Sequence, residues 1–287
     1  MPITLGPNRY GKAETRVVAL RRGTDRHELA DLNVSIALSG ELADTHLTGD
    51  NAAVLPTDTQ KNTVFAFARK YGIDQPESFG LRLAEHFVAT QPAITHARVE
   101  ITDYAWQRVG QTGHSFARGS QEVRTCVVHH DDQATHVLSG VTDLVLLNST
   151  NSEFWGYPKD EYTTLPETTD RILATAVTAT WRHATLDVDW AESHAAARHN
   201  LVDAFTETYS YSLQQTLYAM GWRVLDKQPE LCEVRMALPN KHHFLVDLEP
   251  FGLDNPGEVF FAADRPYGLI EGTVLRDDAP TAGPAWE

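Results

Sequence analysis

The chain has 287 residues, of which 42% are hydrophobic and 22% charged, and its formal net charge is −15 at pH 7. This length suits two domains of ordinary size or one large domain, with enough apolar residues for buried cores. The acidic balance argues against nucleic acid and anionic membrane surfaces as partners.

Three features favour a cytoplasmic location. The sequence has no apolar run long enough to span a bilayer, and its first residues do not form a signal peptide. The two cysteines, Cys126 and Cys232, are far apart in strand-like runs. We therefore expect buried, reduced thiols rather than a disulfide.

The first half of the chain predicts two strands, two helices and two further strands. Alternating apolar residues mark the strands, which are expected over 16–22, 29–39, 97–101 and 123–129. Thr57 followed by Gln60 resembles a capping box, so a helix should begin there. A second helix should follow Pro76, with an apolar stripe of Phe79, Leu83 and Phe87.

The second half repeats this plan. A strand is expected over 177–186, helices over 191–205 and 213–224, and a strand over 232–238. Gln91-Pro92 and Gln228-Pro229 each precede a strand, at the same offset that separates the helices before them.

This repeat predicts an α+β fold of two tandem units, residues 1–140 and 141–287. Each unit should be an antiparallel β-sheet with two helices on one face, in the order ββααββ. Because the other face of each sheet is left uncovered, the pattern also favours assembly into an oligomer.

The central segment 148–175 is rich in turn formers, hydroxyls and aromatic residues. Thr164 and Glu167 fit a second capping box, which would start a short helix carrying Arg171. Phe154, with Trp155 and Tyr157 nearby, offers a planar ring. A ring and a guanidinium in one segment can clamp a flat anionic ligand.

An ordinary structural role for the same segment is the alternative. The aromatic side chains would pack on the core, and Arg171 would pair with a nearby carboxylate from Asp160, Glu161 or Asp170. Taken alone, the segment favours this alternative.

Other candidate residues lie where elements begin or end. Free N–H groups at Thr57 and Asp58 would favour an anion at a helix N-terminus, although ordinary capping explains the pair equally well. Asn240 and His242 follow a strand, where a histidine beside an amide can handle protons. Two further candidates, Lys12 before the first strand and Gln214 at the head of a helix, fit a solvated surface as well.

No metal-binding or cofactor motif stands out. The sequence has no H-E-x-x-H, C-x-x-C, P-loop or G-x-G-x-x-G. The pairs His129-His130 and His242-His243 would point to opposite faces of a strand, and His194 and His199 are poorly spaced for chelation on a helix.

Several longer motifs are spread over essentially the whole chain: Y-G-K, P-T-D-T-Q-K-N-T, S-T-N-S-E-F-W-G, D-E-Y-T-T-L-P-E-T-T-D-R-I-L-A-T and L-P-N-K-H. In sequence, order and spacing, this set resembles the urate oxidase (uricase) family. The resemblance implies two tunnelling-fold (T-fold) units that assemble into a homotetramer around a tunnel. A peroxisomal S-K-L address is missing, which favours the bacterial type.

The resemblance also implies an activity and its residues. Urate would be oxidised by O2 and water to 5-hydroxyisourate and hydrogen peroxide, with no metal or organic cofactor. Phe154 would stack on the purine, and Arg171 and Gln214 would hold its pyrimidine side. The Leu213 main chain, at a position where the family often has Val, would bind there too. Thr57 and Asp58 would bind the five-membered ring.

Catalysis, by the same resemblance, would depend on proton transfer. Lys12, Thr57 and His242 would form a proton relay, and Asn240 with Thr57 would hold O2 or the attacking water. Each site would lie between two subunits, one lending Lys12, Thr57 and Asp58 and the other lending the remaining residues.

Two other functions stay open from the sequence. One is a zinc-dependent pterin enzyme of the same fold, and the other is a purine-binding protein without catalysis. The presence of Lys12, Thr57 and His242 together argues against the second, because a binding protein needs no proton relay.

Overall fold

A computed structural model of the chain describes residues 2–119, 121–263 and 265–287. The chain divides into two compact units. The first comprises the residues up to Gly140 together with Arg182–Glu192 and Pro280–Glu287, and the second comprises Val141–Trp181 and Ser193–Ala279.

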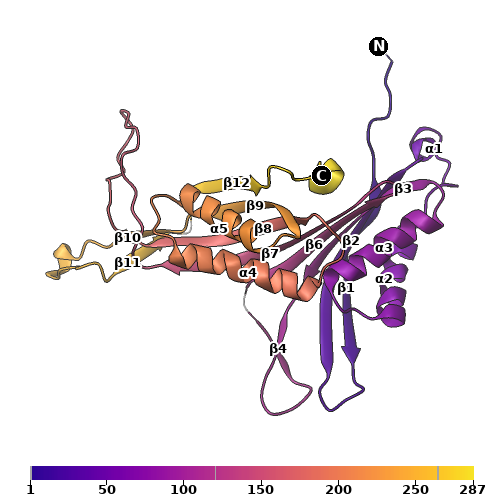
Figure 1. Cartoon of the computed structure of the whole chain (residues 1–287), viewed down its shortest axis with the longest axis horizontal. Coiled ribbons are helices and arrows are strands. Elements are labelled where there is room, and N and C mark those ends of the chain that lie inside the picture. The colour runs from indigo at the N-terminus through magenta and orange to yellow at the C-terminus, as the bar shows by residue number, and fades with distance from the viewer. Residues whose placement is uncertain (1, 120, 264) are drawn as a thin grey trace. The chain divides into compact units, whose positions relative to one another are not determined.

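The first unit is an antiparallel sheet covered on one face by helices (Figure 1). Its strands lie in the order β1-β2-β3-β6, and each neighbouring pair is antiparallel. The elements are β1 (Tyr10–Arg21), β2 (Glu28–Gly40), α1 (Ala43–Leu47), α2 (Thr57–Tyr71), α3 (Pro76–Thr90), β3 (Ile94–Asp103) and β6 (Val123–Asp131), with a small hairpin of β4 (Trp106–Arg108) and β5 (Phe116–Arg118).

Alternation along the strands and the helical stripe build the first core. Val34, Val99 and Ile101 are fully or almost fully buried on one face of the sheet. The α3 stripe of Phe79, Leu83 and Phe87, predicted from its spacing, is buried in the same cluster. Apolar residues recur at every second position in the strands and about every 3.6 positions in the helix. Each element therefore has one apolar face, and the two faces pack together to form the core.

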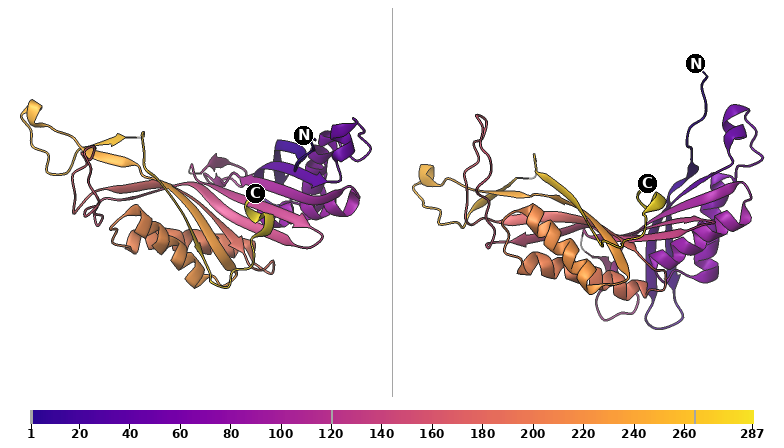
Figure 2. Two further views of the ribbon diagram at one scale, coloured as in Figure 1. Left: turned by 90° about the horizontal axis from the view of Figure 1, so that it is seen from above. Right: turned by 45° about the horizontal axis from the view of Figure 1, so that its top comes forward.

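The second unit has the same plan, with its helices along one face of its strands (Figure 2). Its strand order is β7-β8-β9-β12. The elements are β7 (Thr135–Asn148), β8 (Leu173–His183), α4 (Trp190–Glu207), α5 (Leu213–Lys227), β9 (Leu231–Pro239) and β12 (Leu269–Leu275), with β10 (His242–Leu245), η1 (Glu249–Phe251) and β11 (Phe260–Ala263) after β9. The short 3-10 helix η2 (Gly283–Trp286), near the end of the chain, belongs to the first unit.

The predicted ββααββ repeat and the α+β class are confirmed. The helices α3 and α5 start at Pro76 and Leu213, and the strands β3 and β9 start at Ile94 and Leu231, each pair 137 positions apart. Among the strands β1, β2, β3, β6, β7, β8, β9 and β12, the sequence did not locate β7 and β12, and the short strands β4, β5, β10 and β11 were not predicted either. The residues of β7 are buried almost continuously between Val137 and Val141, so the alternation that marks other strands is absent there.

The structure also bears on the two cysteines and on membrane-spanning segments. Cys126 and Cys232 are both buried and are not joined in a disulfide, as predicted. No helix among the described residues is both long enough and apolar enough to cross a membrane.

Candidate active site

The segment between β7 and β8 folds back on itself at one end of the second unit (Figure 1). Phe154 and Thr168 exchange two main-chain hydrogen bonds of 2.8 and 3.0 Å. The main-chain N–H of Arg171 donates to the carbonyl of Ser152 at 2.8 Å. Arg171 is thereby held two residues before β8 begins, directly alongside the turn that carries Phe154.

The helix expected from Thr164 onward does not form, so that prediction was wrong. The Glu167 carboxylate caps no helix. It accepts a 3.0 Å bond from the N–H of Gly156 and lies 3.4 Å from Lys159. Glu167 therefore bonds to residues on the other side of the folded segment instead of to the main chain near Thr164, although the sequence resembles a capping box.

Arg171 lies over the face of Phe154. The centre of its guanidinium is 5.2 Å from the centroid of the Phe154 ring, and that ring stacks on Tyr157 at 4.8 Å with an interplanar angle of 19°. The Nε of Arg171 donates to the buried hydroxyl of Ser152 at 3.3 Å. Ser152 lies within the S-T-N-S-E-F-W-G motif, but no role was predicted for it from the sequence; in the structure it is a positioning residue for Arg171.

Arg171 carries no counter-ion within the described part of the chain. Two of the three carboxylates that the alternative interpretation offered are engaged elsewhere: Asp170 accepts from Thr150 at 2.9 Å, and Asp160 accepts from Thr163 at 2.8 Å. The third, Glu161, forms no ion pair with Arg171 in the described residues. Burial lowers the pKa of the guanidinium. A half-buried cation beside an aromatic ring and without a carboxylate is suited to receive a flat anion.

The N-terminus of α5 is tied to the same segment. Ser210 donates its N–H to the carbonyl of Asn151 at 3.0 Å and accepts from the N–H of Glu153 at 2.9 Å. Ser212 caps α5 by accepting from the N–H of Gln215 at 3.2 Å. Gln214, the second residue of α5, is exposed in the first helical turn, as predicted.

Leu213 has a different place. Its side chain is buried in the core of the unit, so only its main chain is directed to the N-terminal end of α5. The main-chain N–H groups of the first helical turn have no carbonyl partner four residues earlier. Leu213 can therefore contribute an N–H to a ligand while its side chain anchors the helix.

Asn240 and His242 follow the end of β9, and this end of β9 lies beside the start of β8. Asn240 donates its N–H to Gly268 at 2.7 Å and bridges to Thr175, while Lys241 donates to the carbonyl of Ala174 at 2.8 Å. The chain then enters β10 at His242. These bonds fix both residues at the end of β9 that adjoins the segment of Arg171.

The electrostatics place His242 near Arg171. Burial lowers the pKa of His242, and the positive charge of Arg171 lowers it further. The ring stacks on Phe244 at 5.8 Å. A lowered pKa keeps the imidazole neutral near pH 7, which is the form that accepts a proton.

The remaining candidates belong to the first unit, where Lys12 and Asp58 interact. Lys12 lies within β1, not before it, and a β-bulge follows it in the pairing with β2. Hydrogen bonding to Lys61 at 2.5 Å and to Asn62 holds the pKa of Asp58 below its usual range, and the charge of Lys12 contributes.

Thr57 is the first residue of α2 rather than its cap, so the predicted capping box was wrong. The cap position is Pro56, which has no side-chain oxygen to offer, and the side chain of Gln60 turns inward to the carbonyl of Leu55 at 3.4 Å. The Thr57 hydroxyl has no hydrogen-bond partner within residues 2–119, 121–263 and 265–287. It is therefore available for a ligand or a proton.

The candidate residues thus fall into two groups. The second unit holds Phe154, Arg171, Leu213, Gln214, Asn240 and His242, and the first holds Lys12, Thr57 and Asp58. Among the described residues, no three His, Cys, Asp or Glu side chains are grouped as metal ligands would be.

Comparison with known proteins gives a consistent result. A family model described as Uricase matches residues 8–129 and 137–271. The chain is 51% identical over 284 residues to the uricase of Arthrobacter globiformis, covering 99% of this chain and 94% of that protein. It is 38% identical over 280 residues to the uricase of Dictyostelium discoideum, covering 95% and 98%.

Solved structures agree with these matches. The crystal structure of uricase from Arthrobacter globiformis superposes with a TM-score of 0.97 at 50% identity, covering 100% of this chain and 99% of that chain. A uricase from Bacillus fastidious superposes with a TM-score of 0.79 at 26% identity, covering 96% of each chain.

Proposed function

The chain belongs to the uricase family, and we propose that it is a urate oxidase, which converts urate, O2 and water into 5-hydroxyisourate and hydrogen peroxide. Two electrons pass from urate to O2, two protons reach the peroxide, and water supplies the new hydroxyl group. The clamp of Phe154 and Arg171, with a guanidinium that has no carboxylate partner, is the observation that carries this proposal.

Binding follows from the shape and charge of urate, which is flat and anionic. The ring of Phe154 would stack on the purine, while the two Nη groups of Arg171 and the amide of Gln214 would bind its pyrimidine edge. A main-chain N–H from Leu213 would add a bond there. Stacking fixes the plane of the ring, and the fork of hydrogen bonds fixes its rotation within that plane.

The five-membered ring of urate would be bound by the first turn of α2. Main-chain N–H groups at Thr57 and Asp58 are free of helical partners, and the helix dipole favours negative charge at this end. Charge that develops on the purine as a proton leaves would be stabilised there.

Catalysis would consist of moving protons and placing O2. The free hydroxyl of Thr57 would connect Lys12 with His242 in a relay, because a hydroxyl both donates and accepts. Asn240, together with Thr57, would hold O2 or the attacking water above the ring. The neutral imidazole of His242 would accept a proton at physiological pH.

The assembly would be a homotetramer in the cytoplasm. In each site one subunit would supply Lys12, Thr57 and Asp58, and its neighbour would supply the clamp. Buried thiols at Cys126 and Cys232, which are not joined in a disulfide, suit a reducing compartment.

The direct test is urate consumption followed by absorbance, with O2 uptake and peroxide release measured in the same sample in the presence of EDTA. Equal molar amounts of urate lost, O2 consumed and peroxide formed are expected. Loss of activity in EDTA would instead favour a metal-dependent enzyme of the same fold, and binding of urate without turnover would favour a purine-binding protein.

A further inference from the structure

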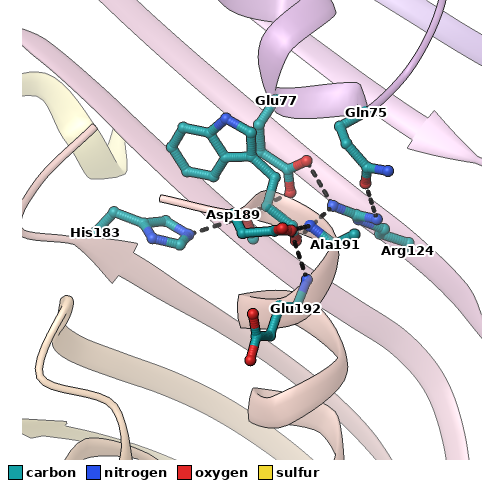
Figure 3. A network of polar contacts seen from close by, with 9 residues as sticks. Gln75, Glu77, Arg124, His183, Asp189, Ala191 and Glu192 are labelled. Atoms are coloured by element: carbon teal, nitrogen blue, oxygen red, sulfur yellow. Dashed lines mark hydrogen bonds and ion pairs between the residues drawn. The ribbon is translucent and has the colours of Figure 1, made fainter. Parts of the chain in front are cut away.

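A buried ion pair occupies the first unit between the start of α3 and the sheet (Figure 3). The Glu77 side chain is fully buried and lies 2.6 Å from Arg124, whose side chain is 16% exposed. The guanidinium also donates to the Gln75 side chain at 2.8 Å and to the carbonyl of Trp190 at 3.2 Å. Three acceptors therefore surround one planar cation.

The repeat gives this cluster a counterpart in the candidate active site. Along the offset of 137 positions that relates α3 to α5 and β3 to β9, Glu77 corresponds to Gln214 and Asp103 to Asn240. Gln214 and Asn240 are the residues assigned above to the substrate, so the first unit presents acids where the second presents amides.

The equivalent of Arg124 is a glycine. Arg124 faces Asp103 in the β3–β6 ladder, and in the second unit Asn240 donates its N–H to Gly268 where the β9–β12 ladder continues. A Cβ at Gly268 would meet only Ile270, at 3.9 Å, so this position is open. Arg124 therefore places a long side chain at a position where its counterpart, Gly268, has none.

We propose that the first unit contains a second ligand pocket that the protein occupies itself, with the guanidinium of Arg124 as the built-in ligand. Its acceptors, the side chains of Glu77 and Gln75 and the carbonyl of Trp190, select a planar cation that donates several N–H groups, namely a guanidinium or amidinium. In the wild-type protein this pocket is closed. Truncating Arg124 opens it.

The charges around the pocket support a cation and not an anion. Burial raises the pKa of Asp103, and the neighbouring charge of Glu77 raises it further while Arg124 opposes this. Ser139 adds a hydrogen bond to the second oxygen of Glu77 at 2.6 Å, which holds that carboxylate in place. With Glu77 held in place beside Asp103, the pocket would keep its preference for a cation once Arg124 is gone.

The test uses Arg124→Ala and measures thermal unfolding and the heat of binding with millimolar guanidinium chloride, against sodium chloride at equal ionic strength. An uncompensated buried carboxylate should lower the Tm of Arg124→Ala by roughly 10 °C. Guanidinium should restore part of this loss with a saturable response, and methylguanidinium should do the same. The Tm of the wild type should show no saturable increase with either guanidinium or methylguanidinium.

Two controls separate this site from general effects of the salt. Arg223→Ala removes the partner of the exposed Glu207 and should give no response to guanidinium. Arg124→Ala combined with Glu77→Gln should also lose the response, because the carboxylate is gone. A Tm for Arg124→Ala equal to that of the wild type, or no saturable response to guanidinium, would overturn the proposal.

A variant that does not fold on expression still gives an answer. Arg124→Ala would then be refolded from urea with and without guanidinium, and recovery of folded protein only with guanidinium supports the pocket. Equal recovery in both, including none, contradicts it. Urate turnover is not a readout in any arm, so failure here is distinct from failure of the urate oxidase assignment.

Discussion

At the scale of single residues, Arg171 is informative because it is half-buried, lies against an aromatic ring and lacks a carboxylate partner among the described residues. Desolvating a cation costs free energy, so a protein retains one there when a ligand compensates. Arg223, which is also partly buried, in contrast pairs with the exposed Glu207 at 2.6 Å.

Arg171→Ala should therefore weaken urate binding far more than it changes folding stability. Losing a charge-assisted pair of hydrogen bonds costs about 1.5–3 kcal/mol, or roughly 10- to 150-fold in Kd. Arg171→Lys should recover only part of the loss, because an ammonium cannot form the fork. Anaerobic titration with urate measures this, with Arg223→Ala as control; an unchanged Kd in Arg171→Ala contradicts the clamp.

The Thr57 hydroxyl gives a second prediction at this scale. Because Thr57 is the first residue of α2 and not its cap, Thr57→Val should change the free energy of unfolding by less than about 0.5 kcal/mol. Its kcat should fall at least about tenfold if the hydroxyl relays protons, and Thr57→Ser should retain most activity. A loss of about 1 kcal/mol in stability would indicate a cap, and an unchanged kcat would remove the relay.

His129 should govern part of the acid stability of the first unit. It is 1% exposed, and burial, with the charges of His96 and Arg98, lowers its pKa to about 3. An unfolded histidine has a pKa of about 6.5. Between these values the unfolded chain binds a proton that the folded chain does not, so stability is lost as pH falls from about 6.5 toward 3.

The expected slope for His129 alone is at most about 1.4 kcal/mol per pH unit in that window. In His129→Gln the free energy of unfolding should fall less steeply as the pH decreases, measured by urea unfolding at pH 7, 6 and 5. His114→Gln, in an exposed loop, should behave like the wild type. If the free energy of unfolding of His129→Gln falls as steeply with decreasing pH as that of the wild type, other titratable groups determine the acid stability.

At the scale of elements, α5 packs so closely on β12 and β9 that only glycine fits at Gly221. A Cβ there would lie 2.6 Å from Val274 Cγ2 and 2.9 Å from Met236 Cε. Gly221→Ala should therefore destabilise the second unit by about 1–3 kcal/mol through overpacking. Gly23→Ala, with nothing within 4 Å, is the matched control. Thermal unfolding measures both, and equal Tm values would contradict the packing.

Prediction from the sequence succeeded where one periodicity dominated an element. The stripe of Phe79, Leu83 and Phe87 identified α3 because three side chains at helical spacing share one face. It failed for β7, whose burial is nearly continuous, and for 164–171, where Glu167 bonds across a folded loop. Local patterns carry no information on such long-range hydrogen bonds.

The candidate site shows the same division. Its residues were named through long motifs that resemble a family, and the structure brings two of them, Arg171 and Phe154, into contact. The hydrogen bonds of Ser152 with Arg171 and of Ser210 with the folded segment were not predicted, because bonds between residues distant in the sequence leave no local pattern.

At the scale of the whole molecule, the sheet face without helices in each unit carries exposed apolar side chains. Val18 and Leu20 on β1 in the first unit, and Val145 and Leu147 on β7 in the second, are 40–58% exposed. Apolar side chains left exposed on a sheet face are available for association with another subunit. It supports the proposed homotetramer, in which a site draws Lys12 and Thr57 from one subunit and the clamp from another.

Mixing two inactive variants tests this shared site most directly. Lys12→Met lacks the relay lysine and Arg171→Ala lacks the clamp, and the two chains would be co-refolded in equal amounts and assayed with urate. If each site combines two chains, random pairing should leave roughly one quarter of the sites intact, with that fraction of wild-type activity. Activity no greater than the sum of the two separately refolded variants would contradict a site built from two subunits.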